Sequence, residues 1–350
     1  MALSKLNNDS FADTAVHGRR NLIINGAANV NQRRDSTGIT AEGYYGPDRW
    51  YYKTEGEETV SISQASDGPD GFANSYKVEV TTTDGTIAAD DYARVETRFE
   101  GQDLQQLKYG TSGAESITLS FYVKSSVTGT YAVAFYSADG VRAIGSTYTI
   151  SSANTWEYKT LTFAGDTGGT INDDNTEALR VWFVLSAGSN FTSSDNTSWG
   201  AYSAGKVAYG HTANVIGTSS ATWQITGVQL EVGEQATPFE HRSFAQELEA
   251  CRRYFVGMGA FYSDFWGQTG TQIVGVMIGA HANNAYVSFK TLNGTQMRAT
   301  PTAVIKGTPK LTNFSSNQQN LTAAGITSHH TLNFTYDGSQ RTALEHIAIN

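Results

Sequence analysis

The chain has 350 residues, of which 39% are hydrophobic and 16% are charged; 35 are glycine, and the formal net charge is −9. The hydrophobic fraction suffices for packed cores, which argues against an intrinsically disordered chain. The low charged fraction and the many glycines argue against a helical bundle or a coiled coil, so the chain is predicted to be mostly β. The negative net charge argues against nucleic acid as a partner, because contacts with phosphate need clustered positive charge.

The cysteine count and the hydropathy pattern limit the cellular setting. The single cysteine, Cys251, cannot form an intramolecular disulfide or a zinc site built from cysteines. No run of about 18 apolar residues occurs, so no membrane insertion is expected. Residues 1–20 mix Asn, Asp, His and Arg where a signal peptide needs an apolar stretch, so no export signal is expected either.

The charge is divided unevenly along the chain. Residues 251–350 contain seven Lys or Arg and three Asp or Glu, a net charge of +4, whereas residues 1–250 carry −13. This asymmetry predicts two domains with different surfaces. Residues 1–20 are polar and offer no core of their own, so we interpret them as an N-terminal docking arm that orders on binding.

From residue 21 onward, short apolar or alternating segments are separated by turns rich in Gly, Asp and Asn. Alternation of apolar and polar residues with a period of two is typical of strands with one buried face. The expected strands are 21–26, 48–52, 75–80, 116–124, 130–136, 156–163, 179–185 and 221–232. This series predicts a jelly-roll β-sandwich over residues 21–242.

The one segment with helical periodicity follows the predicted sandwich. Ser243 and Gln246 have the spacing of a capping box. Apolar residues follow at intervals of four, three and four, namely Phe244, Leu248, Cys251 and Phe255. These features predict a short linker helix over residues 243–254. Alternation then returns in several short segments, which predicts a second, smaller β domain over residues 255–350.

Two groups of residues at the ends of the predicted sandwich resemble a known family. The first is Asn21–Gly26, followed by Asp48-Arg49-Trp50. The second runs from Ile225 through Pro238-Phe239-Glu240-His241-Arg242 to Tyr254, and the segment 297–302 adds a further similar strand. These segments resemble tail-fibre and other virion structural proteins of tailed bacteriophages, notably phages of marine bacteria and cyanobacteria.

The resemblance implies a β-sandwich similar to carbohydrate-binding modules, carried on the virus particle in homotrimeric fibres, and it implies nothing catalytic. The implied location is the virion, assembled in the host cytoplasm. The implied partners are further copies of the chain, other phage tail or capsid proteins reached through the N-terminal arm, and host-surface polysaccharide. The family often has an acidic residue after its opening Asn-Gly pair, whereas this chain has Ala27.

The physical interpretation of these motifs is mainly structural. We expect Trp50, Trp223, Pro238 and Phe239 to fill or close the sandwich, because large aromatic residues at strand ends usually belong to a core. Asp48 and Arg49 are expected to pair with each other or to satisfy loop backbone. The remaining residues of the second motif are interpreted as a buried ion and hydrogen-bond cluster that braces the domain junction, namely Glu240, His241 and Arg242.

Motifs of catalysis are absent from the sequence. It has no His-Glu-x-x-His, phosphate-binding loop, Gly-x-Ser-x-Gly or dinucleotide-binding motif, and its seven histidines are scattered. No catalytic residue is therefore assigned, and the chain is expected not to be an enzyme. A polysaccharide-degrading tailspike remains as an alternative, because the distance between two carboxylates that defines a glycosidase does not follow from a sequence.

An acidic, glycine-containing loop at residues 166–177 offers the best ligands for an ion. Calcium prefers several carboxylate and carbonyl oxygens on a flexible loop. Asp173, Asp174 and Glu177 are therefore the candidate ligands of a structural calcium ion, and the alternative is a solvated loop. The pairs Asp90-Asp91 and Glu57-Glu58 are similar but weaker candidates. No other cofactor is expected.

Exposed aromatic rings beside side-chain amides are the usual means of binding sugars. The long loop at residues 189–218, which shows no core pattern, offers Asn196, Trp199, Tyr202 and Tyr209. The second domain offers Tyr262 and Trp266. The leading hypothesis is a fibre or adhesin subunit that binds host glycan with these residues. The alternatives are subunit contacts or local packing, in a purely architectural virion protein such as a capsid decoration, a tail-fibre adaptor or a cap.

Overall fold

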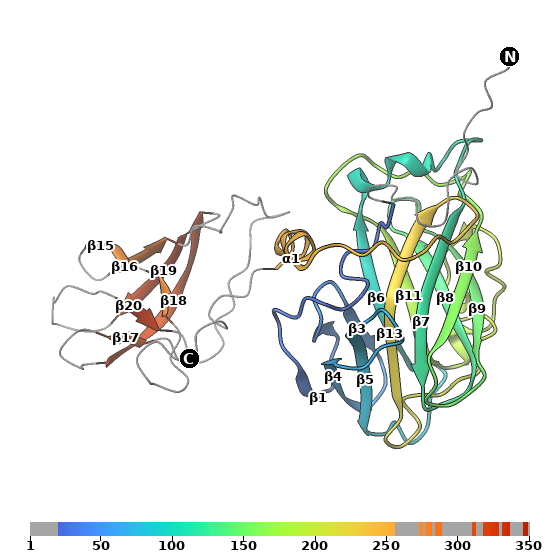
Figure 1. Ribbon diagram of the computed structural model, residues 1–350, viewed down its shortest axis with the longest axis horizontal. Coiled ribbons are helices and arrows are strands. Elements are labelled where there is room, and N and C mark those ends of the chain that lie inside the picture. The colour runs from blue at the N-terminus through green and yellow to red at the C-terminus, as the bar shows by residue number, and fades with distance from the viewer. Residues whose placement is uncertain are drawn as a thin grey trace, which may run out of the picture. The chain divides into compact units, whose positions relative to one another are not determined.

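The computed structural model describes residues 20–255 and, beyond them, seven strands between residues 273 and 348. The chain divides into two compact units, Met1–Leu248 and Glu249–Asn350. The described residues contain one α-helix and otherwise mainly strands, all of whose pairings are antiparallel (Figure 1). Residues 1–19 of the predicted arm lie outside the described residues, as do Tyr262 and Trp266.

Two sheets form the first unit. Sheet A has the spatial order β1 (Ser36–Ile39), β4 (Thr59–Ala65), β5 (Ser75–Thr82), β13 (Thr222–Val232), β7 (Ile117–Ser125) and β10 (Glu157–Phe163). Sheet B has the order β12 (Gly200–Ala201), β9 (Arg142–Ile150), β8 (Gly129–Ser137), β11 (Glu177–Ala187), β6 (Tyr92–Glu100), β3 (Tyr51–Thr54) and β2 (Gly43–Tyr44). Strands from the beginning, middle and end of the unit are neighbours in each sheet, so the predicted jelly-roll β-sandwich is confirmed.

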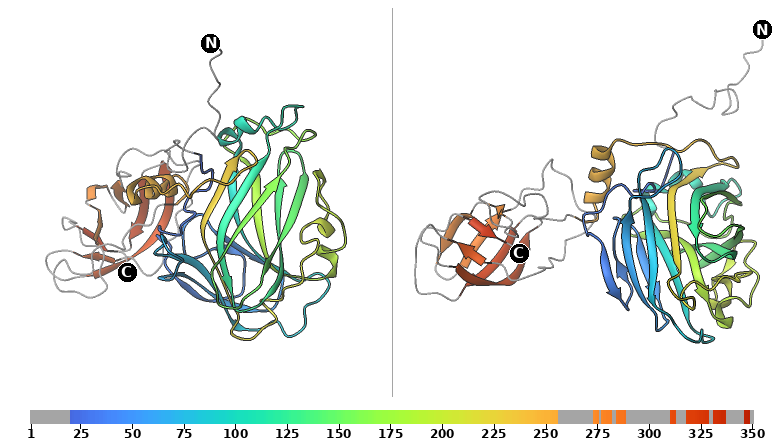
Figure 2. Two further views of the ribbon diagram at one scale, coloured as in Figure 1. Left: turned by 45° about the vertical axis from the view of Figure 1, so that its right-hand side comes forward. Right: turned by 60° about the horizontal axis from the view of Figure 1, so that its bottom comes forward.

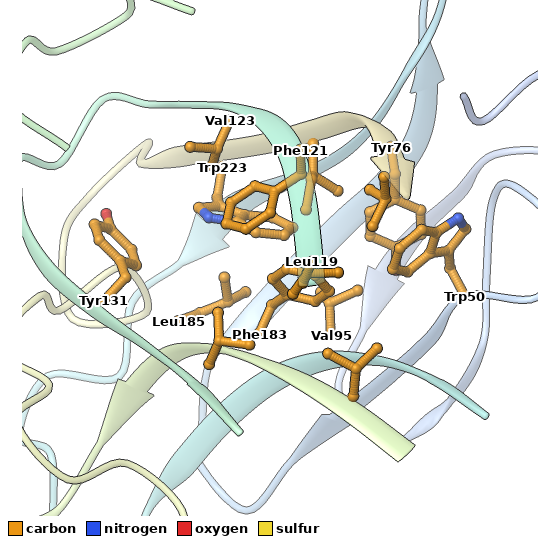
Figure 3. Close-up of a cluster of buried hydrophobic side chains, with 14 of the residues drawn as sticks. Trp50, Tyr76, Val95, Leu119, Phe121, Val123, Tyr131, Phe183, Leu185 and Trp223 are labelled. Carbon is orange, nitrogen blue, oxygen red and sulfur yellow. The ribbon is translucent and has the colours of Figure 1, made fainter. Parts of the chain in front are cut away.

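The core lies between the two sheets, which face each other (Figure 2). Trp50, Phe183 and Trp223 lie in a row across it, with ring centroids 6.1 Å apart at each step (Figure 3). Trp50 is 1% exposed and Trp223 is fully buried, so both predicted core residues are confirmed. The burial of each such side chain stabilises the fold by about 1.5–3 kcal/mol or more.

The strands differ from the prediction in two respects. β4, β6 and β9 form where the alternation did not single out a strand. Residues 21–26, expected as a strand, are irregular, and Asn25 there has a left-handed φ of 60°. A strand cannot continue through that conformation, because it reverses the direction of the backbone.

The helix α1 (Phe244–Arg252) begins with the predicted capping box. The N–H of Gln246 donates to Oγ of Ser243 at 3.4 Å, and the N–H of Ser243 donates to the Gln246 side chain at 3.1 Å. The predicted apolar face is buried at Cys251 but not at Phe244, which is 58% exposed. Phe244 lies in the first turn, where the chain has only just left the sandwich.

The described strands of the second unit form a separate seven-stranded sheet, as the predicted second β domain requires. Its order is β14 (Ile273–Gly275), β20 (His346–Ala348), β17 (Lys310–Thr312), β18 (Gln318–Ser328), β19 (Thr331–Tyr336), β16 (Asn284–Ser288) and β15 (Met277–His281).

Candidate functional site

The two segments that carry the family resemblance meet where the chain enters and leaves the sandwich. The N–H of Asn21 donates to the carboxylate of Glu240 at 2.7 Å. The guanidinium of Arg242 donates back to the backbone carbonyls of Asn21 and Ile23. The side-chain oxygen of Asn21 accepts from the N–H of Leu230 in β13 at 3.1 Å, which ties the entering segment to the last strand. We call this set of contacts the terminal junction.

Asn25 extends the terminal junction into the core. The fully buried side-chain amide of Asn25 donates to the carbonyls of Val30 at 2.8 Å and Asp48 at 2.9 Å, and the backbone carbonyl of Asn25 accepts from the indole of Trp50 at 3.2 Å. Its backbone N–H donates to the carboxylate of Glu247 in α1, and burial raises the pKa of that carboxyl group. The motif residues therefore hold one another in place by hydrogen bonds, and their role here is structural.

The expected pair between Asp48 and Arg49 does not form. Asp48 accepts from the N–H of Gln32 at 3.1 Å and lies 3.4 Å from the guanidinium of Arg33. Burial raises the pKa of Asp48. Arg49 has a left-handed φ of 77° and donates to the carbonyl of Arg98, so the two side chains diverge. The other expectation, that these residues satisfy loop backbone, is confirmed for Asp48, which accepts from the loop residue Gln32, whereas Arg49 donates to a carbonyl of strand β6.

The aromatic part of the second motif packs outside the core and does not plug it. Pro238 is exposed. The ring of Phe239 lies 5.0 Å from Phe72 and 4.9 Å from His241, and Phe72 in turn lies 5.5 Å from the outward-facing Tyr122. His241 is exposed, so it is not a member of a buried ion cluster. The closing segment runs along the outer side of sheet A, which the spacing of aromatic residues in a sequence does not reveal.

The candidate calcium ligands do not converge. Asp174 accepts from the backbone and hydroxyl of Thr176, at 2.8 and 2.6 Å. Glu177 accepts from Arg180 and lies 3.4 Å from Arg98, whereas Asp173 is exposed. In the part of the chain that the structure describes, no group of three or more His, Cys, Asp and Glu side chains could hold a metal ion. Asp166, at the start of this loop, is fully buried and pairs with Arg142 at 2.8 Å, so the loop is only partly solvated.

The long loop at residues 189–218 covers part of the outer face of sheet B, and it has a small core of its own. Val207 and Ala208, both buried, pack against side chains of β8 and β11, among them the 2% exposed Trp182. Asn196 is also buried, and its side chain donates to the carbonyl of Lys206 at 2.6 Å, so it braces the loop and does not face a ligand.

The three aromatic candidates of this loop have different surroundings. Trp199 is partly buried against the main core, with its indole donating to the carbonyl of Ala164 at 2.7 Å and its ring 5.6 Å from Tyr109. Tyr209 is 39% exposed. Tyr202 is 37% exposed, and its ring lies 5.1 Å from Tyr136 of β8. Only Tyr202 is therefore joined to a larger aromatic surface.

That surface is the part of sheet B's outer face that the loop leaves open. Strand pairing places Arg180 of β11 beside Tyr136 of β8 on one side and Arg98 of β6 on the other. The pairing of β3 with β6 and β2 adds Tyr51 and Tyr44 farther along the sheet. We call the following set the tyrosine–arginine face: Tyr44, Tyr51, Arg98, Tyr136, Arg180 and Tyr202.

A chain of ion pairs fixes the arginines of this region. The buried Glu96 accepts from Arg94 at 3.0 Å and from Arg98 at 2.6 Å, and Glu177 links Arg98 to Arg180. Each guanidinium also lies over a ring: Arg94 is 4.1 Å from the centroid of Trp182, and Arg98 is 4.4 Å from that of Tyr51. Arg180 lies 5.6 Å from the centroid of Tyr136. The resulting network holds rings and cations in one rigid row.

The tyrosine–arginine face offers the chemistry that sugars require. Partly exposed tyrosine rings provide flat apolar surfaces for the C–H face of a sugar ring, and guanidinium groups donate to hydroxyl or carboxylate oxygens. The side chains of Arg98 and Arg180 are 25% and 26% exposed, so their heads reach solvent. Because the row is built on strands, its spacing is fixed before a ligand binds.

Sequence reasoning identified only Tyr202 of this face. A usable signal was present in β6, where Arg94, Glu96 and Arg98 occupy alternate positions. Charged residues at every second position of an otherwise apolar strand indicate an outward face with function. To predict which tyrosines lie beside these charged residues, one must know the order of the strands in the sheet. The sequence did not provide that order.

Comparison with known proteins gives structural likenesses only. No family model matches the sequence, and no curated protein matches it. The chain is similar to the enzymatically active domain of tailspike protein 4 of bacteriophage CBA120, with 14% identity and a TM-score of 0.35. That match covers 61% of this chain and 21% of the tailspike chain, about a fifth of its length.

Two modules of bacterial origin are similar over nearly their whole length. One is a family 11 carbohydrate-binding module of Clostridium thermocellum in complex with a mixed-linked tetrasaccharide, with 13% identity, a TM-score of 0.29 and coverage of 61% of this chain and 99% of the module. The other is the N-terminal cellulose-binding domain of Cellulomonas fimi β-1,4-glucanase C, with 12% identity, a TM-score of 0.29 and coverage of 57% and 97%.

Among the described residues, no helix has the length and apolar character needed to cross a membrane.

Proposed function

We propose that this chain is a non-enzymatic subunit of a bacteriophage virion fibre or adhesin, and that its tyrosine–arginine face binds host-surface glycan. The observation that carries the proposal is a row of partly exposed tyrosine rings beside arginines, from Tyr44 through Tyr51 to Tyr136 on sheet B, which Tyr202 of the adjoining loop extends. The resemblance of the junction segments to phage tail-fibre proteins supports the virion setting.

The proposed mechanism is multivalent binding. A single row of tyrosines on an open sheet face gives weak affinity, because it covers only one side of a sugar chain. A homotrimer on a particle would present several such rows, and linked sites raise avidity without further contacts. The N-terminal arm would attach the subunit to the tail or the capsid.

The two carboxylates near the face support a binding role over hydrolysis. Glu96 is fully buried and accepts from two guanidinium groups, and Glu177 likewise lies between Arg98 and Arg180. A glycosidase needs one carboxyl group that can donate a proton to the glycosidic oxygen and a second that acts as base or nucleophile. A carboxylate enclosed by arginines is poorly suited to act as that proton donor.

Substitution of single tyrosines tests the proposal on arrays of host polysaccharide. Tyr51→Ala, Tyr136→Ala and Tyr202→Ala should each weaken binding about tenfold, since a lost ring contact is worth about 1–1.5 kcal/mol. Tyr158→Ala is the matched control, because Tyr158 is 49% exposed and lies on β10 of the opposite sheet. Equal binding by all four variants would contradict the assignment of the face.

A purely architectural virion protein is the second candidate. The terminal junction favours it, because the residues of that junction serve the packing of the sandwich. Absence of binding to every host glycan, with the protein present on the particle at the copy number of a capsid or tail symmetry, would support this candidate. Release of reducing ends from host polysaccharide would overturn both. The mass of the intact oligomer tests the homotrimer.

A further inference from the structure

Glu58 is a buried carboxylate, and one of its two oxygens makes no hydrogen bond with the described residues. It lies just before β4 and is 1% exposed. Its Oε1 accepts from the hydroxyl of Tyr52 and from that of Thr54, the latter at 2.6 Å. Its Oε2 is buried and has no hydrogen-bond partner among the described residues. A buried acceptor without a partner is rare in folded proteins and calls for an explanation.

Asp84 is a second buried carboxylate, just after β5, and it is 4% exposed. Its Oδ1 accepts from the N–H of Thr86 at 3.2 Å, and its Oδ2 accepts a long bond of 3.4 Å from the N–H of Glu57. Oδ2 therefore has little of its hydrogen-bonding capacity filled.

Glu58 Oε2 and Asp84 Oδ2 face the same small space beside Gly56. A Cβ added to Gly56 would lie 2.4 Å from Glu58 Oε2 and 2.9 Å from Asp84 Oδ2. The third neighbour of that point is the Cδ1 atom of Ile216, at 3.0 Å, so the space has an apolar wall. Any residue larger than glycine at position 56 would collide with the oxygens.

No positive charge from the described residues balances the pair. None of the ion pairs within residues 20–255 includes Glu58 or Asp84. Two ionised carboxylates that point into one buried space repel each other and have lost their hydration. Something that carries positive charge therefore belongs between them.

We infer that Glu58 Oε2 and Asp84 Oδ2 bind a hard divalent cation, Ca²⁺ or Mg²⁺. Carboxylate oxygens are the ligands that both ions prefer, and Mg²⁺ in particular is held by one or two carboxylates while water fills its other positions. Two protein carboxylates meet that requirement. The site lies between the β3–β4 turn, which holds Glu58, and the segment after β5, which holds Asp84; it is separate from the acidic loop at residues 166–177 and independent of the proposed glycan binding.

Thermal unfolding of the full chain in EDTA and in excess CaCl₂ or MgCl₂ tests the inference. At a concentration a hundredfold above Kd, the bound ion should raise the wild-type midpoint by about 5–10 °C. Glu58→Gln and Asp84→Asn should abolish the rise. In EDTA both variants should be at least as stable as the wild type, because each removes one of two repelling charges. The variants would then be less stable than the wild type with the ion present and at least as stable without it, which distinguishes loss of the ion site from a general folding defect.

A second measurement covers the case in which both variants fail to fold. Terbium, which replaces calcium at oxygen sites, should show sensitised emission on the wild-type protein because the ring of Tyr52 lies against Glu58. Added calcium should remove that emission. Asp173→Asn, in the exposed acidic loop, is the matched control and should keep both the emission and the rise in midpoint. Equal midpoints in EDTA, calcium and magnesium, without terbium emission, would overturn the inference and leave a shared proton as the link between the carboxyl groups.

Discussion

His211 shows how the loop at residues 189–218 imposes an unusual state on one side chain. The residue is 9% exposed, and its Nδ1 atom accepts from the N–H of Ala132 in β8 at 3.1 Å. Its ring lies 5.7 Å from that of Tyr131. Burial lowers the pKa of His211 to about 4. The imidazole is therefore neutral in the folded protein at a pH where an unfolded chain would protonate it.

This depressed pKa predicts a loss of stability in mild acid. Between pH 6.5 and 4 the unfolded state binds more protons at His211, so the free energy of unfolding falls as the pH drops through that range. From pH 7 to 5 the expected loss is about 2 kcal/mol. His211→Asn keeps an acceptor near Nδ1 but does not titrate, so it should lose this part of the pH dependence. Urea unfolding at both pH values measures it, and identical losses in the two proteins would refute the assignment.

Single residues also show where sequence reasoning succeeds. Trp50 and Trp223 are core residues as predicted, because a large aromatic residue in an alternating strand has few other places to go. The exposure of Phe239 and Trp199 was harder to predict, since the exposure of a ring outside a strand depends on which distant segment covers it. The pair Glu57-Glu58 was a weaker ion candidate in the sequence, but the burial of Glu58 could not be predicted, because a glutamate in a turn normally faces solvent.

Among the elements, the loop at residues 189–218 depends on one glycine of the sheet beneath it. The N–H of Gly145 in β9 donates to the carbonyl of Asn196 at 2.7 Å. A Cβ at Gly145 would lie 2.0 Å from the side-chain nitrogen of Asn196, the atom that donates to Lys206. The loop can approach β9 this closely only because residue 145 has no side chain.

Gly145→Ala is therefore expected to displace Asn196 and loosen the loop, at a cost of about 1–3 kcal/mol in the free energy of unfolding. Limited proteolysis should then cut within residues 189–218 faster than in the wild type. Gly113→Ala is the matched control, since its only near neighbour would be the hydroxyl of Thr111 at 3.8 Å. If both substitutions left proteolysis unchanged, the close approach would not be what holds the loop.

The sheets themselves could be predicted only in part. β7 and β13 are evident from the sequence because apolar and polar residues alternate along them, although the structure buries most residues on both faces of each strand. β6 was not predicted, because every second position along it carries a charged residue; the structure nevertheless buries both of its faces, where Glu96 pairs with Arg94 and Arg98. The tyrosine–arginine face depends on the pairing of β6 with β11 and β3, and such long-range pairing is not encoded in local periodicity.

At the scale of the whole molecule, the terminal junction makes the proposed docking arm separable from the fold. Removal of residues 1–19 leaves the contacts of Asn21 with Glu240 and Arg242 intact, so the unfolding midpoint should not change. If the arm docks the subunit, the shortened protein should fold normally yet fail to join the virus particle. Unfolding curves and the protein content of purified particles measure the two effects.

A longer deletion provides the contrast. Removal of residues 1–25 also takes away Ile23, which is 1% exposed, and the buried amide of Asn25. Loss of the Ile23 side chain alone should destabilise the sandwich by about 2–5 kcal/mol. If the shorter deletion destabilised the protein as much as the longer one, residues 1–19 would be part of the fold.

The terminal junction also decides how the sandwich experiences mechanical force. Because Asn21 and Arg242 are in direct contact, tension applied along the chain from residue 20 to residue 243 crosses the module at this one place. The two sheets and the tyrosine–arginine face lie outside that path and carry none of this tension. Force transmitted between residues 20 and 243 would strain the junction first, while the geometry of the sheets stays unchanged; force applied through a glycan on the tyrosine–arginine face would instead cross the sheets.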